Sequence, residues 1–266
     1  MSALADLAVG RAAVISLAAA RAGGLVAISP WPGQSVPTHA RGALVLALAS
    51  CALTLDLAPE TSLVAPSGGP WWTGLLLGCT AEIGCGLLMG FVVRLVFSAI
   101  DVLASSLSYA LGLSTPVVPD PDSGTTEPPL ARAMTLGALA LALSAGVHRD
   151  LIARLLASFR TLPLGAPLHL TASLPEVVSF AGASISAGIS LAMPFIATAL
   201  AVQLVLALVG RAAPSLQLFS IGFTLLTLAG LSLLSNALEG IAVRALAHLA
   251  LVGAWIDTVF VAVVGG

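Results

Sequence analysis

The 266-residue sequence contains little charge, no lysine and few aromatic residues. Only 8% of the residues are charged, against roughly 25% in soluble domains, and all ten basic residues are arginines. The formal net charge of −2 argues against a nucleic-acid partner, which requires a basic face. With 58% hydrophobic residues and a mean hydropathy of +1.07, the composition is that of a protein that crosses a membrane several times.

The residues of enzyme and metal chemistry are also scarce. Cys51, Cys79 and Cys85 lie in apolar runs without CxxC spacing, which is typical of buried free thiols. The four histidines lie near the ends of apolar runs without neighbouring ligands, and no HExxH, Gly-x-Ser-x-Gly or glycine-rich phosphate motif is present. The sequence therefore predicts no catalytic residue, no metal site and no cofactor, and hence a protein that is not an enzyme.

Proline is concentrated in the middle of the chain, between Tyr109 and Pro129. Its five prolines remove backbone donors and favour extended backbone, so no continuous helix survives there. Gly112 and Gly124 supply positions where the backbone can adopt conformations that other residues rarely adopt. Bare backbone is prohibitive in lipid, so this central loop either faces water or is held inside protein. The central loop is the best candidate for a functional element, although an ordinary aqueous loop fits its composition equally well.

Apolar runs of helical length account for most of the remaining chain. They cover about 9–28, 39–57, 71–109, 130–147, 176–209, 216–234 and 241–266, with an amphipathic piece at 151–159. We expect Met193-Pro194 to kink or divide one run, and the polar residues between Ser235 and Gly240 to separate the last two. The predicted fold is all-α: a polytopic membrane protein of about six to seven hydrophobic helical segments, some kinked or hairpin-like, with a proline-rich central loop. We expect one domain over residues 1–266.

The first apolar run is only marginally suited to lipid. Its strongly apolar residues together contribute roughly −2 to −4 kcal/mol to insertion, and a central arginine such as Arg21 opposes with about +2.5 to +3.5 kcal/mol. The sum is close to zero. We therefore expect this helix to be surrounded by protein.

Among the charged residues of the apolar runs, we expect four to be buried: Arg21, Glu82, Arg94 and Asp101. They either pair across helices and fix the packing, or they define a transport route; we favour helix packing. In the third run, Gly74, Gly78, Gly86 and Gly90 have the small-xxx-small spacing that permits close helix contact.

Five stretches, in order, resemble one known family, the FliR-type proteins of flagellar export gates and their injectisome counterparts, called SctT-type. These are Gly33-Gln34-Ser35-Val36-Pro37 with Arg41; the run 82–91, similar to E-I-x-I-G-x-x-x-G-F; Gly112-Leu113-Ser114 with Asp120-Pro121; the run 158–165, similar to S-F-x-x-x-P-x-G; and the run 211–219 with Gly222-Phe223. Ala110, Ser215 and Thr224 depart from the family pattern. The flagellar subfamily fits better, but the system stays open between flagellum and injectisome.

The resemblance implies a single-copy, multi-pass subunit of the type III export gate in the bacterial inner membrane, at the base of a flagellum or injectisome. It implies FliP-type and FliQ-type neighbours, an FlhB-type switch protein and exported unfolded proteins as partners. It places the central loop at the pore as a plug, through Gly112, Leu113, Ser114, Pro119, Asp120, Pro121 and Gly124. It also implies a subunit-contact motif, Arg211, Pro214, Gln217 and Phe219. The alternative from the residues alone is a small-solute secondary transporter; an intramembrane hydrolase would need a nucleophile that the sequence does not offer.

Overall fold

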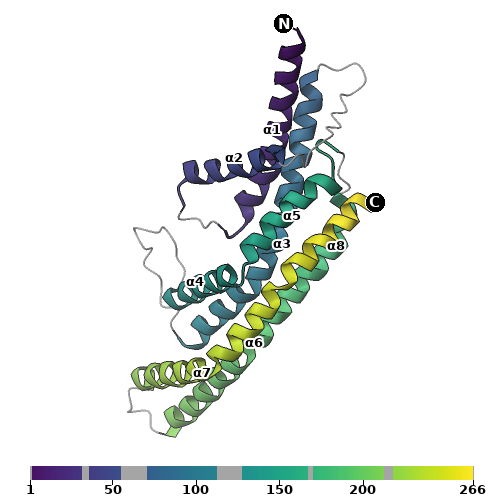
Figure 1. Cartoon of the computed structure of the whole chain (residues 1–266). Coiled ribbons are helices and arrows are strands. Elements are labelled where there is room, and N and C mark those ends of the chain that lie inside the picture. The colour runs from purple at the N-terminus through teal and green to yellow at the C-terminus, as the bar shows by residue number, and fades with distance from the viewer. Residues whose placement is uncertain are drawn as a thin grey trace. The chain divides into compact units, whose positions relative to one another are not determined.

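The computed structural model describes residues 2–31, 36–54, 71–112, 128–166, 170–212 and 218–265. These ranges form eight helices (Figure 1): α1 Ser2–Ile28, α2 Thr38–Thr54, α3 Trp71–Ala110, α4 Pro129–Ser144, α5 Val147–Thr161, α6 Leu170–Ala212, α7 Leu218–Leu249 and α8 Leu251–Gly265. Within the described ranges, four stretches are long and apolar enough to cross a membrane: Arg11–Ile28, Trp72–Ala110, Thr171–Ala212 and Gly222–Val263. A fifth is possible by length if α4 and α5 together form one broken span. The predicted class, an all-α polytopic membrane protein, is confirmed.

Several predicted helix ends agree with the structure, but two predicted breaks do not. α1 ends at Ile28, directly before Ser29 and Pro30, and α3 begins at Trp71. α6, however, passes Pro194 without interruption, so the predicted division there is wrong. One proline removes a single backbone hydrogen bond, which a long apolar helix tolerates.

α7 continues through the predicted break between Ser235 and Gly240, and the chain leaves the helix only at Ala250. Two polar side chains at the expected break, Ser235 and Asn236, bond to their own helix backbone. Ser235 Oγ donates to the Ser232 carbonyl at 2.9 Å and Asn236 Nδ2 donates to the same oxygen at 2.7 Å. Their polar groups are therefore satisfied without ending the helix.

The break between α4 and α5 lies at Gly146, two residues before the predicted interruption at His148. Gly146 has a φ of 78°, a left-handed conformation that glycine adopts at low cost. Its carbonyl accepts the amide of Arg149 at 2.9 Å, which starts α5. α5 is amphipathic as predicted: it buries Leu151, Leu155 and Phe159 and exposes Arg160.

The contacts within the chain divide it into two units. Unit 1 comprises Met1–Leu95, Gly146–Phe180 and Ala250–Gly266, and unit 2 comprises Val96–Ala145 and Ala181–Leu249. Each unit therefore uses part of α3 and part of α6. A single export-gate domain over 1–266 stays a prediction.

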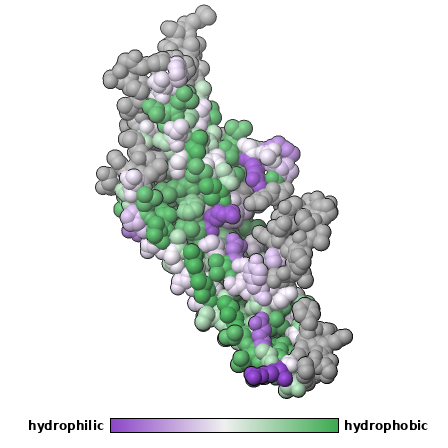
Figure 2. Space-filling view, turned by 180° about the vertical axis from the view of Figure 1, so that it is seen from behind, coloured by the Kyte–Doolittle hydropathy of each residue, from purple (hydrophilic) through white to green (hydrophobic). Residues whose placement is uncertain are grey.

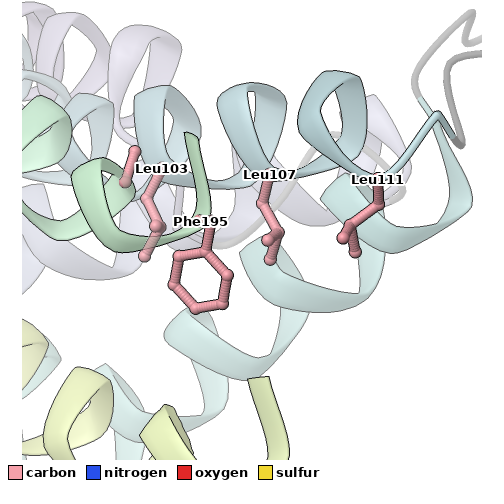
Figure 3. Packing of buried hydrophobic residues seen from close by; sticks show 5 residues of the cluster. Leu103, Leu107, Leu111 and Phe195 are labelled. Carbon is pink, nitrogen blue, oxygen red and sulfur yellow. The ribbon is translucent and has the colours of Figure 1, made fainter. Parts of the chain in front are cut away.

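The core of unit 2 lies between α3 and α6 (Figure 3). Leu103 and Leu107 of α3 and Leu111, the residue after its end, are spaced four residues apart, so they lie on the same side. They pack with Ala192 and Phe195 of α6. Partly buried residues of α4 and α7 surround this cluster: Leu130, Met134, Leu233, Leu234, Ala237 and Ile241.

Large apolar side chains are exposed along α6, and apolar surface is extensive on the face drawn in Figure 2. On α6 the exposed set includes Leu174, Val178, Ile185, Ile189, Met193, Ile196, Leu200, Leu204 and Leu208. Monomeric soluble proteins rarely leave contiguous apolar patches of this kind uncovered. This surface requires lipid or further protein against it.

Candidate functional site

Unit 1 contains a fully buried arginine, Arg21 of α1. Its guanidinium meets the carboxylate of Glu82 of α3 in a two-pronged ion pair. Nε donates to Glu82 Oε2 at 2.5 Å, and Nη2 donates to Glu82 Oε1 at 3.0 Å. Glu82 is itself 2% exposed. Paired N–H···O bonds of this kind are the strongest that an arginine forms with a carboxylate.

The remaining N–H groups of Arg21 bind the end of α5 and the turn after it. Nη1 donates to the Ser158 carbonyl at 2.9 Å and to Ser158 Oγ at 3.1 Å, and Nη2 donates to the Leu162 carbonyl at 3.1 Å. The guanidinium also lies 4.8 Å from the centroid of the Phe159 ring. A guanidinium has five N–H donors, and the structure uses all five.

Glu82 fastens the same turn from the other side. Its Oε1 accepts the backbone N–H of Gly165 at 2.8 Å. Gly165 has a φ of 80°, a conformation that side-chain-bearing residues adopt only with strain. We call Arg21, Glu82, Ser158, Leu162 and Gly165 the Arg21 cluster. It joins three segments that are far apart in sequence: α1, α3 and the turn that follows α5.

Glycines bring the backbones of α1 and α3 into direct contact beside this cluster. A Cβ on Gly86 would lie 2.0 Å from the Arg21 carbonyl oxygen, and one on Gly24 would lie 2.6 Å from the Ile83 carbonyl oxygen. A Cβ on Gly90 would lie 2.8 Å from the Leu25 carbonyl oxygen. The close helix contact predicted from the glycine spacing is thus present at Gly86 and Gly90.

Arg94 and Asp101, the other two charges expected to be buried, are exposed in this chain. Asp101 accepts a hydrogen bond from Thr135 Oγ1 of α4 at 3.2 Å. The prediction that these two are buried is therefore wrong for the isolated chain. The side chains of both residues stay open to solvent in the described part of the chain, and their spacing in the sequence does not reveal this.

The central loop begins at Gly112, the second residue after the end of α3. Gly112 has a φ of 67°, so the chain leaves the helix in a conformation that glycine adopts readily. The other predicted plug residues, Leu113, Ser114, Pro119, Asp120, Pro121 and Gly124, lie outside the described residues. The described chain resumes at Pro128, next to the first residue of α4.

α7 packs against both ends of the central loop. At the first end, the Cδ2 of Leu111 lies 1.5 Å from the position that a Cβ on Gly230 would take, so the leucine fills the space above that glycine. Gly112 itself lies close to Phe223 and Leu226. Figure 3 shows Leu111, at this first end, together with the other residues of the apolar cluster of unit 2. At the second end, α4 packs along α7. One helix therefore fixes where the loop starts and where it ends.

The predicted subunit-contact motif is only partly described. Arg211 is exposed at the end of α6, and Phe219 lies in the first turn of α7. Pro214 and Gln217, and the side chain of Phe219, lie outside what the structure describes. Its role in contacts between subunits stays a prediction.

The described residues contain no cluster of three His, Cys, Asp or Glu side chains that could hold a metal ion. What sequence reasoning missed is the role of the run 158–165. The sequence marks this run as a motif, but nothing in it indicates that the Ser158 and Leu162 carbonyls bind Arg21. The one local signal is Gly165, whose identity indicates a turn with positive φ.

Comparison of the sequence with known proteins finds one matching family. The family model for bacterial export proteins, family 1, matches residues 12–250. The chain is 30% identical over 233 residues to the flagellar biosynthetic protein FliR of Caulobacter vibrioides, covering 86% of this chain and 90% of that protein. It is 37% identical over 163 residues to the FliR of Escherichia coli, covering 60% of this chain and 62% of that protein. The FliR of Aquifex aeolicus is 32% identical over 171 residues, 63% of this chain and 64% of its own length.

Proposed function

This chain belongs to family 1 of the bacterial export proteins, and from that premise we propose that it is a component of the flagellar export apparatus. More specifically, we propose that it is a subunit of the type III export gate in the inner membrane, where it helps to form the protein-conducting pore and carries part of its plug. The flagellar names of its relatives support the flagellar system over the injectisome.

The observation that carries the plug assignment is the packing of α7 against both ends of the central loop. Leu111 in contact with Gly230 fixes the first end, and α4 against α7 fixes the second. The loop sequence between them is rich in proline, which has no N–H to donate. A segment whose ends are fixed, and whose prolines leave it with fewer N–H donors, can be displaced without unfolding the helices that hold it. An arriving unfolded chain would thus open the passage at little energetic cost.

The exposed face of α6 supports assembly with neighbouring subunits. Gly182, Ser186 and Ser190 are exposed at four-residue spacing, beside the exposed Ile185 and Ile189. A Cβ on Gly182 would meet nothing within 4 Å in this chain. Small residues at this spacing allow another helix to approach closely, whereas contact with lipid does not require small residues. We propose that FliP-type and FliQ-type subunits cover this face and that an FlhB-type switch protein contacts the assembly.

The Arg21 cluster weakens the alternative of a small-solute transporter. A transport route requires a charged group with bonding capacity left for its solute or ion. Every N–H of Arg21 is already bonded within unit 1, and Glu82 binds both Arg21 and Gly165. The cluster is a packing element, and the transporter loses its clearest candidate binding site.

Co-expression with candidate FliP-type and FliQ-type proteins, followed by native mass measurement, tests the proposal. We expect a complex containing all three proteins. Ser186→Leu should reduce its yield by crowding the small-residue face, whereas Gly137→Leu, at an open position of α4, should leave the yield unchanged. A stable monomer that ignores both candidates, or equal yields for both variants, would contradict the proposed assembly.

A further inference from the structure

A groove with a volume of about 670 Å³ lies between α5 and α8, two helices that pack against each other in unit 1. α5 contributes the small side chains of Ala153, Ala157 and Thr161, and α8 contributes Asp257 together with apolar residues such as Val261. We call it the α5–α8 groove. We propose that it receives an apolar helix of a neighbouring subunit, and that an arginine or lysine of this helix pairs with Asp257. This inference rests on the proposed function, which supplies the neighbouring subunits.

The charges at the groove leave one carboxylate in excess. Arg154 Nε donates to Asp150 Oδ2 at 2.9 Å, and Arg154 Nη1 pairs with Asp257 Oδ2. Two carboxylates therefore share one guanidinium. Within the ranges that the structure describes, Arg154 is the only partner of Asp257. The Asp257 side chain is nevertheless 65% exposed, so it has room for a second cation.

The chain shows no second cation for Asp257. All ten basic residues are arginines, and every one of them lies within the described ranges. None of the others pairs with Asp257 in the structure. The residues outside the described ranges include no arginine or lysine. A further cation for Asp257 therefore comes from another chain.

The surroundings of Asp257 favour a helix over lipid or water. Asp257 lies in the candidate span Gly222–Val263, and Arg154 lies in the broken span that α4 and α5 form together. Acyl chains in the groove would meet an incompletely paired carboxylate, which is costly in a membrane. Water in the groove would leave the exposed Val261 uncovered. An apolar helix with one basic side chain satisfies the carboxylate and covers the apolar residues.

The α5 side of the groove has the shape that such a helix requires. Ala153, Ala157 and Thr161 are exposed and follow one another at four-residue spacing, so they lie on one face of α5. Small residues at this spacing let a second helix bring its backbone close. The groove thus combines close approach on α5 with an excess negative charge on α8.

The first test identifies what lies at the groove in the full chain, co-expressed with its candidate FliP-type and FliQ-type partners. Val261, which is 72% exposed, is replaced by the photoreactive amino acid benzoylphenylalanine, and cross-linked peptides are identified by mass spectrometry. We expect a cross-link to an apolar segment of one partner that contains an arginine or lysine. Val243 of α7 is the matched control: it is 61% exposed, does not line the groove, and should not cross-link to that segment.

A cross-link from position 261 only to phospholipid, to a second copy of this chain or to the chain itself would overturn the proposal. The same holds if no cross-link forms within an assembled complex, or if position 243 gives the same product. If the unmodified chain forms no complex at all, the proposed function is wrong, and the groove has no such partner.

The second test removes the excess charge. Asp257→Asn should lower the recovery of the cross-linked partner at least about tenfold, because the cation of the partner loses its carboxylate. Asp257→Glu, which keeps the charge, should retain most of the recovery. Glu239→Gln removes an exposed carboxylate of α7 in the same candidate span and should change nothing. Arg154 keeps Asp150 in the Asp257→Asn chain, so its unfolding temperature should equal that of the unmodified chain; if it falls, the cross-link decides.

A double-variant cycle then tests the pairing itself. Replacing the basic residue of the cross-linked segment by Gln should lower the recovery by the same factor as Asp257→Asn, and the two changes together should cause no further loss. Additive losses, full recovery with Asp257→Asn, or an equal loss with Glu239→Gln would overturn the pairing.

Discussion

Arg21 and Glu82, 61 residues apart in sequence, form a two-pronged ion pair that is shielded from solvent on both sides. An arginine in this position makes α1 alone a poor membrane helix, because its insertion energy is close to zero. Glu82 supplies the opposite charge, and the Ser158 and Leu162 carbonyls accept the remaining N–H groups. Unit 1 is therefore complete only when α1, α3 and the turn after α5 are all present.

Replacing Arg21 by Met should destabilise the protein strongly. The change leaves the Glu82 carboxylate buried without its cation, and breaking a buried pair in this way costs about 3–5 kcal/mol. Thermal unfolding in detergent, followed by loss of monodisperse protein, measures the effect. Arg160→Met removes an exposed arginine of α5 and should change stability by less than about 0.5 kcal/mol.

The double variant Arg21→Met with Glu82→Met separates the ion pair from the general packing of the region. Removing both charges leaves no unpaired ion, so the double variant should be more stable than either single one. If its loss instead equals the sum of the two single losses, Arg21 and Glu82 do not act as a pair.

Gly86→Ala should be destabilising although alanine is the better helix former. The new methyl group would lie 2.0 Å from the Arg21 carbonyl oxygen, which is backbone and cannot turn aside. Overpacking of this kind costs typically about 1–3 kcal/mol. Gly42→Ala in α2, where a Cβ meets nothing within 4 Å, should instead gain up to about 1 kcal/mol from helix propensity. Equal shifts in unfolding temperature for the two variants would contradict the close contact of α1 with α3.

Gly230→Ala tests the claim that α7 fixes the start of the central loop. The added methyl group would occupy the place of the Leu111 side chain, which must then move together with the end of α3. We expect assembly with the sister subunits to persist and ion leakage through the complex to rise. Gly240→Ala on the same helix has open space around it and should leave the leak at the level of the unmodified protein. An unchanged leak in Gly230→Ala would show that the packing of Leu111 against Gly230 does not hold the start of the loop in place.

The fold class, the family resemblance and the limits of most helices could be predicted from the sequence, because hydrophobic run length and proline position act locally. The exceptions have local causes as well. Ser235 and Asn236 indicate a break only if their side chains lack hydrogen-bond partners. In the structure both side chains donate hydrogen bonds to the Ser232 carbonyl. Pro194 indicates a division only if the helix cannot spare one hydrogen bond.

The candidate site was less accessible to sequence reasoning. The charge of Arg21 predicts that it needs an acidic partner, but the sequence offers Glu82 and Asp101 on equal terms. Which acidic residue lies beside Arg21 depends on how α1 packs against α3. The backbone contacts of Gly24 and Gly86 set the relative position of these two helices. The Ser158 and Leu162 carbonyls are backbone groups, which every residue carries, so no residue type could mark them.

Deleting Thr115 to Thr126 from the central loop tests most directly whether this chain carries a pore plug. The deletion removes the proline-rich segment and keeps Leu111, Gly112 and α4, which pack on α7. The measurement is ion conductance across membranes that contain the complex assembled with its FliP-type and FliQ-type partners, with the amount of complex determined in parallel. We predict a raised conductance at an unchanged amount of complex. A conductance equal to that of the unmodified protein, in complexes formed to the same extent, would contradict the plug.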